Sequence, residues 1–225
     1  MNDFSIYSST QMFLFFSAFS SLVIGYKHRK KYYPLKNFYL YPLSSLLQFA
    51  TFYITTSFNL DITHETNIIS ASIYIFLLSE FILVYQFFLR LFVLPSLKKS
   101  FFFLRIGFGI IFILYWPLVN NNFLSPTEFY ALEAIYILIP AFIYLNHFLK
   151  NPIIPDLTNE PSFWITIGLI FYFSCTLPIF LLKDFVFSVD GFIYESELFS
   201  INYICYGCLF LLITKAYLCK KPDLQ

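Results

Sequence analysis

The chain has 225 residues, of which 59% are hydrophobic, 23% are aromatic and only 12% are charged, and its formal net charge is +1. Soluble domains carry about 25% charged residues, so this chain lacks the polar surface that a soluble protein needs. The small net charge gives no basis for binding nucleic acid. The composition therefore predicts a multi-pass membrane protein whose first partner is the lipid bilayer.

Seven apolar stretches follow one another along the chain. At about 1.5 Å of rise per residue, helices of this length approach or cross a hydrocarbon core of about 30 Å. Their connections are short, so no soluble catalytic or binding domain is expected between them. We predict an all-α fold, a single seven-helix transmembrane domain over residues 1–225. The expected helices run over about 10–26, 37–58, 68–90, 101–119, 129–149, 163–182 and 199–218.

The first two predicted helices carry small and polar side chains. Serines and Gly25 lie on the first, and small residues let helices approach closely in lipid. The second has a polar stripe at three- and four-residue steps, so this side should face the bundle interior. The stripe consists of Tyr41, Ser44, Ser45, Gln48, Thr51 and Thr55.

The third predicted helix, 68–90, has one acid, Glu80, at its middle, with Gln86 further along. Acids within membrane segments are costly and mark functional sites by default. Two interpretations stay open: a proton- or ligand-binding carboxyl, or a protonated acid that fixes packing. Neither Arg90 nor Arg105 is expected at its depth. We therefore predict that Glu80 is largely protonated, or lines a wet cavity shared with the second and fifth helices.

The fifth predicted helix, 129–149, carries a second membrane acid, Glu133, about one turn from its start. A carboxyl there could simply be hydrated. A helical face of polar aromatic side chains nevertheless accompanies it, and such a face can line a pocket or only pack against other helices. This face consists of Tyr130, Glu133, Tyr136, Pro140, Tyr144 and His147.

The sixth predicted helix, 163–182, has Ser162 as its expected N-cap, and an acidic loop over 183–198 should separate it from the seventh. Lys215 lies within a turn of the end of the seventh helix, where snorkelling explains it better than a retinal Schiff base. No disulfide, metal or cofactor is expected, because the cysteines lie in or beside apolar helices and the histidines lack ligand spacing. These residues are Cys175, Cys205, Cys208, Cys219, His28, His64 and His147.

The basic residues predict the orientation. Of 14 lysines and arginines, only Lys183 falls on the opposite side from the rest. Since basic residues concentrate in cytoplasmic loops, the N-terminus should lie outside, the C-terminus in the cytoplasm, and the protein in the cytoplasmic (inner) membrane.

Residues 160–182 resemble a segment of uncharacterised seven-helix membrane proteins of Bacteroidota, where similar regions stand ahead of histidine kinase domains. Phe163 to Gly168, together with Tyr172, carry this resemblance. It implies a membrane-sensor region and supplies no catalytic residue.

The leading functional hypothesis is a membrane-embedded sensor or accessory subunit. Only six residues, 220–225, follow Cys219, so it would signal to a separate cytoplasmic partner or membrane subunit. The alternative is a small transporter or channel with a polar interior formed by the second, third and fifth helices; an integral-membrane enzyme comes third. The candidate ligand or proton site consists of Glu80, Glu133, Gln48, Tyr136, Tyr144, His147 and Gln86.

Overall fold

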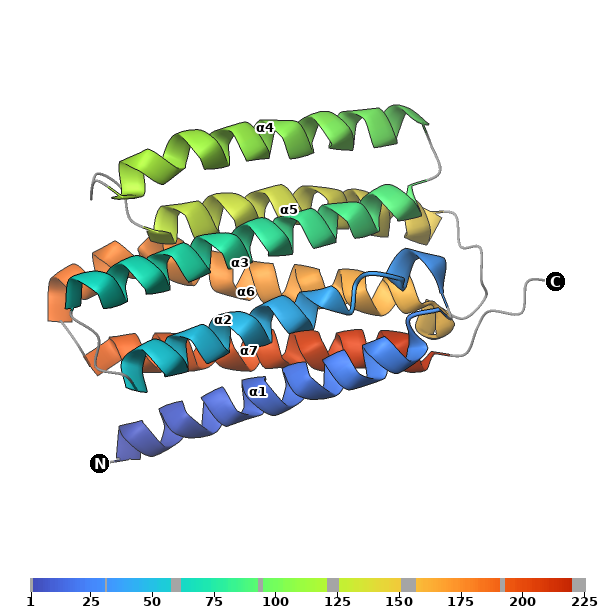
Figure 1. Ribbon diagram of the computed structural model, residues 1–225. Helices are drawn as coiled ribbons and strands as arrows, with labels where there is room; N and C mark the ends of the chain where they lie inside the picture. Colours follow the sequence, from blue (N-terminus) through green and yellow to red (C-terminus); the bar gives the residue numbers. More distant parts are fainter. Residues whose placement is uncertain are drawn as a thin grey trace.

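Seven α-helices run side by side along one common direction in the computed structural model (Figure 1). It describes residues 2–30, 32–57, 62–92, 95–120, 126–150, 157–190 and 193–219. Within those ranges the chain is helical and has no β-strand, which confirms the predicted all-α class. The helices are α1 (Asn2–His28), α2 (Leu40–Ser57), α3 (Ile62–Leu91), α4 (Pro95–Asn120), α5 (Pro126–Lys150), α6 (Pro161–Asp190) and α7 (Ile193–Leu218), with short 3₁₀ helices η1 (Tyr33–Leu35) and η2 (Leu157–Asn159).

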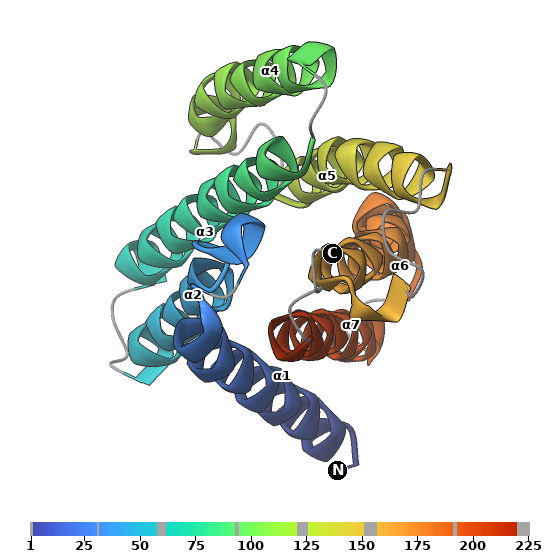
Figure 2. The ribbon, with the colours of Figure 1, turned by 90° about the vertical axis from the view of Figure 1, so that its right-hand side faces the viewer.

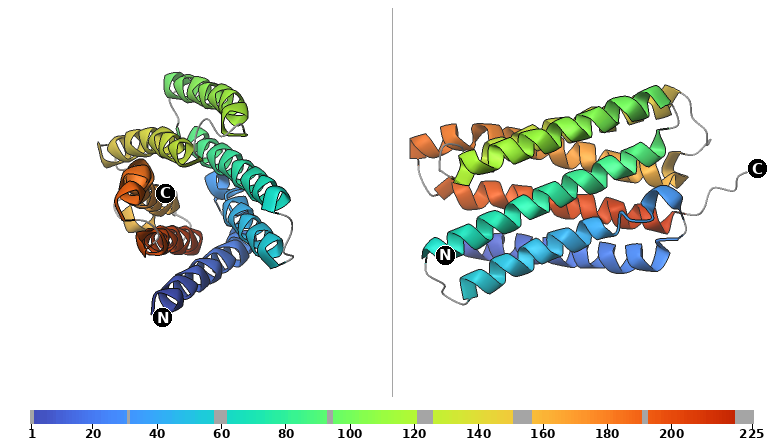
Figure 3. Two further views of the ribbon diagram at one scale, coloured as in Figure 1. Left: turned by 90° about the vertical axis from the view of Figure 1, so that its left-hand side faces the viewer. Right: turned by 45° about the horizontal axis from the view of Figure 1, so that its top comes forward.

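Six of these helices form a closed ring, and α4 lies outside it. Around the ring, α1 contacts α2, α2 contacts α3, α3 contacts α5, α5 contacts α6, α6 contacts α7, and α7 returns to α1. Figure 2 and the left view of Figure 3 show this order from the two ends of the bundle. α4 packs on the outside of α3 and α5. The ring order means that side chains of five or six helices can meet in one interior.

Several helices extend beyond their predicted ends. The loop predicted over 183–198 is wrong, because α6 continues to Asp190 and α7 begins at Ile193. Residues 183–190 contain neither proline nor glycine, so nothing in them interrupts the helix before Gly191. Residues 58–61, 93–94, 121–125, 151–156 and 191–192 between the helices, and the tail 220–225, lie outside the described residues.

The prediction of Ser162 as an N-cap is also wrong. α6 begins at Pro161, which suits the first helical position because its missing N–H has no partner to lose there. Glu160 precedes it, and the Glu160 carbonyl accepts the backbone N–H of Phe163 at 3.2 Å. Ser162 therefore lies within the first turn, where its hydroxyl is free to bond other side chains.

Five helices are long and apolar enough to cross a membrane within the described residues. They are Ser8–His28, Ala71–Leu91, Phe129–Lys150, Pro161–Leu181 and Leu198–Leu218. α2 and α4 are not among them. α2 has only 18 residues, about 27 Å of helix, and carries the polar stripe. α4 has Lys98, Lys99 and Arg105 in its first half.

The distribution of polarity also fits a protein with several membrane passes. Large apolar side chains point outward, and the exposed fractions of Ile75 and Ile113 reach 70%. The acids whose side chains the structure describes, Glu80, Glu133 and Glu160, are buried instead. A soluble protein hides its apolar side chains and exposes its acids. The inverse arrangement is the one expected in lipid.

Aromatic rings fill the interior and hold α4 to the ring of helices. Phe108 of α4 stacks on Phe81 of α3 with ring centroids 3.8 Å apart, and it also lies 5.3 Å from Phe129 of α5. Offset ring contacts of this kind add to the energy of burial. They leave Phe102 and Phe103 of α4 exposed on its outer side.

Candidate functional site

Two carboxyl groups from different helices lie buried inside the ring of helices. Glu80 of α3 is 2% exposed and Glu133 of α5 is 0% exposed. Each lies within the electrostatic range of the other. The Tyr41 hydroxyl, from the first turn of α2, donates a hydrogen bond to Oε1 of Glu80. The interpretation of Glu133 as a hydrated side chain near the membrane surface is therefore wrong, because the side chain is closed off from solvent.

Tyrosines from α5, α6 and α7 complete the surroundings of these two acids. Tyr172 of α6 stacks on Tyr206 of α7 with ring centroids 4.7 Å apart, and the Tyr206 ring lies 6.3 Å from that of Tyr41. Tyr130 of α5 has both acids among its electrostatic neighbours. We call this group the carboxyl cluster; it consists of Tyr41, Glu80, Tyr130, Glu133, Tyr172 and Tyr206.

Three oxygen atoms of the carboxyl cluster have no hydrogen-bond partner. They are both carboxyl oxygens of Glu133 and the hydroxyl of Tyr206, although Ser45 lies near Tyr206. Among the described residues, no basic side chain acts on either acid. A buried polar group without a partner costs about 1–3 kcal/mol, and an unpaired buried charge costs far more. The cluster therefore retains unused hydrogen-bonding capacity, most of it at Glu133.

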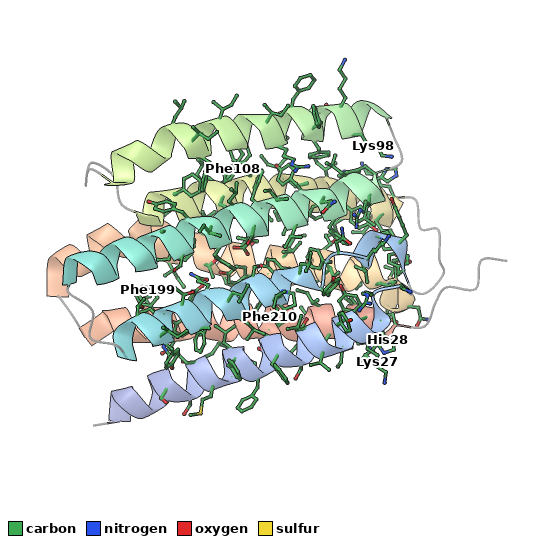
Figure 4. All side chains as sticks on the ribbon, in the orientation of Figure 1. Lys27, His28, Lys98, Phe108, Phe199 and Phe210 are labelled. Atoms are coloured by element: carbon green, nitrogen blue, oxygen red, sulfur yellow. The ribbon has the colours of Figure 1, made fainter. Side chains whose placement is uncertain are left out.

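A second hydrogen-bonded group lies where α1, α3, α5 and α7 end. Basic side chains gather there, and Figure 4 shows Lys27, His28 and Lys98 at this end. Glu160, only 6% exposed, accepts hydrogen bonds from the Tyr32 hydroxyl at 2.6 Å and the Ser162 hydroxyl at 2.7 Å. Ser162 is also 2.7 Å from the Tyr144 hydroxyl. We call these four residues, Tyr32, Tyr144, Glu160 and Ser162, the basic-end junction.

The phenol of Tyr32 is held in its neutral, donating form. Burial raises its pKa well above the usual value, and its hydrogen bond to the Glu160 carboxylate raises it further. Tyr32 therefore stays a donor to Glu160 throughout the physiological pH range.

One stretch of chain joins the two groups. Residues 32–41, which we call the α1–α2 segment, begin at Tyr32 in the basic-end junction and end at Tyr41 in the carboxyl cluster. Leu35 and Phe38 between them are almost fully buried. The Tyr217 hydroxyl of α7 donates to the Leu35 carbonyl at 3.1 Å, and the Phe38 ring stacks on that of Tyr41 at 5.4 Å. Leu35, Phe38 and Tyr41 thus anchor the segment in the bundle, whereas the side chains of Tyr33 and Lys36 are exposed.

Some of the predicted site residues belong to the carboxyl cluster or the basic-end junction, and others belong to neither. Glu80 and Glu133 come together, and Gln48 is half-buried with its amide near Tyr130. Tyr144 belongs to the basic-end junction instead. Of the other three, Gln86 is half-buried on α3, Tyr136 is half-buried with its ring 5.3 Å from Phe108, and the exposed side chain of His147 lies in the last turn of α5.

Sequence reasoning missed four residues of these groups: Tyr32, Glu160, Tyr172 and Tyr206. Glu80 and Glu133 could be recognised in the sequence because each is an acidic residue within an apolar stretch. Tyr172 and Tyr206 are 2 of 18 tyrosines and had no such signal. Glu160 stood next to Pro161, where its position before a helix was the available clue.

The cysteines form no metal site in the part of the chain that the structure describes. All four are free thiols, and no group of three or more His, Cys, Asp or Glu residues is arranged to hold a metal ion there. Cys205 lies close to Cys175 of the neighbouring helix α6. The two are packed in the apolar interface between α6 and α7.

Comparisons with known proteins give no relative: no family model, no curated protein and no solved structure matches this chain.

Proposed function

We propose that the protein is a sensor or accessory subunit of the cytoplasmic membrane, crossing it seven times. In this proposal the carboxyl cluster binds a proton or a small ligand. The change is transmitted to the basic end of the bundle, where a separate cytoplasmic partner or membrane subunit reads it. The α1–α2 segment is the transmitting element.

A single observation carries this proposal. Tyr41, which bonds the interior acid Glu80, and Tyr32, which bonds Glu160 at the basic end, lie nine positions apart on one segment, which is anchored in the bundle by its buried residues Leu35 and Phe38. A change in the Glu80–Tyr41 hydrogen bond therefore acts on the α1–α2 segment, whose other end is bonded to Glu160 through Tyr32. Coupling needs such a physically continuous element, with two arrangements that a ligand can bias.

The second candidate is a small transporter that uses the same interior. It is favoured by the polar cluster between α2, α3 and α5, with contributions from α6 and α7, because ionisable groups inside a membrane often mark the path of a substrate. Both acids are closed off from solvent. This fits an occluded binding site better than the open aqueous path of a channel.

The orientation is tested separately. A reporter enzyme active only outside the cytoplasm, fused after Gln225, is expected to stay silent, because Lys27, Lys98, Lys150 and Lys215 all lie at the end of the bundle near the C-terminus. The matched fusion within the turn at 121–125 should be active. Activity of the C-terminal fusion would overturn the topology.

The transmission is tested with Trp164, whose indole N–H donates to the Thr158 carbonyl at 2.7 Å beside the basic-end junction. In a Trp116→Phe background, Trp164 is the only tryptophan. We expect its fluorescence to change with pH, and Glu80→Gln or Tyr41→Phe to abolish the change.

Tyr53→Phe is the matched control, because Tyr53 lies on the same helix as Tyr41 but donates to Gln11 instead, at 2.9 Å. It should keep the pH response. A response that survives in both the Glu80→Gln and Tyr41→Phe proteins would refute the transmission. Solute flux into proteoliposomes that requires Glu80, without any response of Trp164, would favour the transporter.

A further inference from the structure

We infer that Glu80 and Glu133 form a pair of carboxyl groups with unequal roles. Glu133 keeps its proton, and Glu80 releases a proton and binds it again. This deepens the proposed function, on which it rests, by naming the proton as the ligand of the carboxyl cluster. It also assigns the proton site to two acids on neighbouring helices, and not to Glu80 alone.

The charges of the cluster require at least one bound proton. The two acids lie within electrostatic range of each other and of four tyrosines, one from each of α2, α5, α6 and α7: Tyr41, Tyr130, Tyr172 and Tyr206. Among the described residues none of the groups acting on the acids is basic. Two ionised carboxyls side by side in a low dielectric, with no cation, repel each other strongly. One of the two must therefore be neutral.

The packing of the cluster favours a proton over a larger occupant. The rings around the acids touch one another: Tyr206 lies 4.7 Å from Tyr172 and 4.6 Å from Phe210, and Tyr41 lies 5.7 Å from Phe210. An organic amine or a hydrated metal ion would have to displace these rings. A proton is the one cation that occupies the site without added volume.

Hydrogen bonding assigns the two roles. Glu80 accepts the Tyr41 hydroxyl, and a donated hydrogen bond stabilises the ionised form of a carboxyl. Glu133 has no donor at either oxygen and no exposure, so nothing compensates a charge there. When Glu80 ionises, its O–H bond breaks, the electron pair stays on the carboxylate, and water at the membrane surface takes up the proton. Tyr41 keeps its own proton and remains the donor.

The experiment is infrared spectroscopy of the purified full-length protein across pH, which detects the C=O stretch of protonated carboxyls. We expect two buried-carboxyl bands. One should disappear reversibly as pH rises and be absent from the Glu80→Gln protein; the other should persist wherever the protein is folded and be absent from Glu133→Gln. Glu160→Gln, which removes a buried acid outside the cluster, should retain both bands.

Several results would overturn the pair. These are the absence of both bands, a titrating band that belongs to Glu133 while that of Glu80 stays constant, or loss of a band on adding sodium or potassium chloride at fixed pH. The last would make the ligand a metal cation.

The infrared bands test the proton pair, and the fluorescence of Trp164 tests the proposed sensor, so either proposal can fail without the other. Bands as expected without a response of Trp164 would leave the proton pair standing and remove the sensor. A response of Trp164 that requires Glu80, without a titrating band, would keep the sensor and exclude the proton as its ligand.

Discussion

Glu133→Met is expected to leave the free energy of unfolding unchanged or to raise it, whereas Glu80→Met should lower it by about 1–3 kcal/mol. The two acids are both buried, but they differ in hydrogen bonding. Removing Glu133 removes two unpartnered oxygens and places an apolar chain of similar size in the same space. Removing Glu80 leaves the Tyr41 hydroxyl, inside a fully buried side chain, without its acceptor.

The measurement is reversible unfolding in mixed micelles, followed by circular dichroism at a pH near neutrality. The double variant Tyr41→Phe/Glu80→Met serves as the control, because it removes donor and acceptor together. It should recover much of the stability that Glu80→Met loses. Equal destabilisation by the Glu133 and Glu80 variants would mean that Glu133 has a hydrogen-bond partner that the structure lacks.

The same pair of acids illustrates what the sequence could and could not predict. Each was recognisable alone, because a carboxyl within some twenty apolar residues has few structural uses in lipid. Their meeting was not predictable. It depends on α3 packing against α5 while α4, the helix between them in the sequence, lies outside the ring. Helix order in space follows from side-chain packing over long sequence separations, and hydropathy contains no record of it.

The polar stripe on α2 was informative about direction but not about contacts. It placed Tyr41, Ser45 and Gln48 on the inner side, where Tyr41 meets Glu80 and Gln48 approaches Tyr130. Of the α1–α2 segment, residues 37–41 were predicted as the start of the second helix, and residues 32–36 were left between two helices. Its buried members Leu35 and Phe38 are ordinary apolar residues whose burial depends on packing against α3 and α7.

Helix ends were predicted least well, and the reason is chemical. Residues 183–190 were assigned to a loop for their charge, but a helix stops at a residue that breaks its geometry, such as Gly191, and not at a charged one. The same holds at Pro161, which begins α6 and so makes Ser162 available to Glu160 and Tyr144. Proline therefore marked the starts of α4, α5 and α6, whereas charge did not mark the end of α6.

Gly25→Ala should lower the free energy of unfolding by about 1–3 kcal/mol, although alanine favours helix more than glycine does. A Cβ atom at Gly25 would lie 2.9 Å from the ring of Tyr217 and 3.0 Å from Cβ of Tyr39. Tyr217 is 2% exposed and its hydroxyl is bonded to the Leu35 carbonyl, so the ring has little room to move. The added methyl group therefore forces α1 away from α7, or breaks the bond to the α1–α2 segment.

Gly109→Ala is the matched control. Nothing lies within 4 Å of a Cβ at Gly109 on α4, so this variant should be neutral, or more stable by up to about 1 kcal/mol from helix propensity alone. Unfolding of both variants in mixed micelles gives the comparison, and the pH response of Trp164 in the Gly25→Ala protein adds a second readout. Because the Leu35 anchor lies on the transmitting segment, we expect that response to weaken. If both alanines prove neutral, the close approach of α1 and α7 at Gly25 is not present in solution.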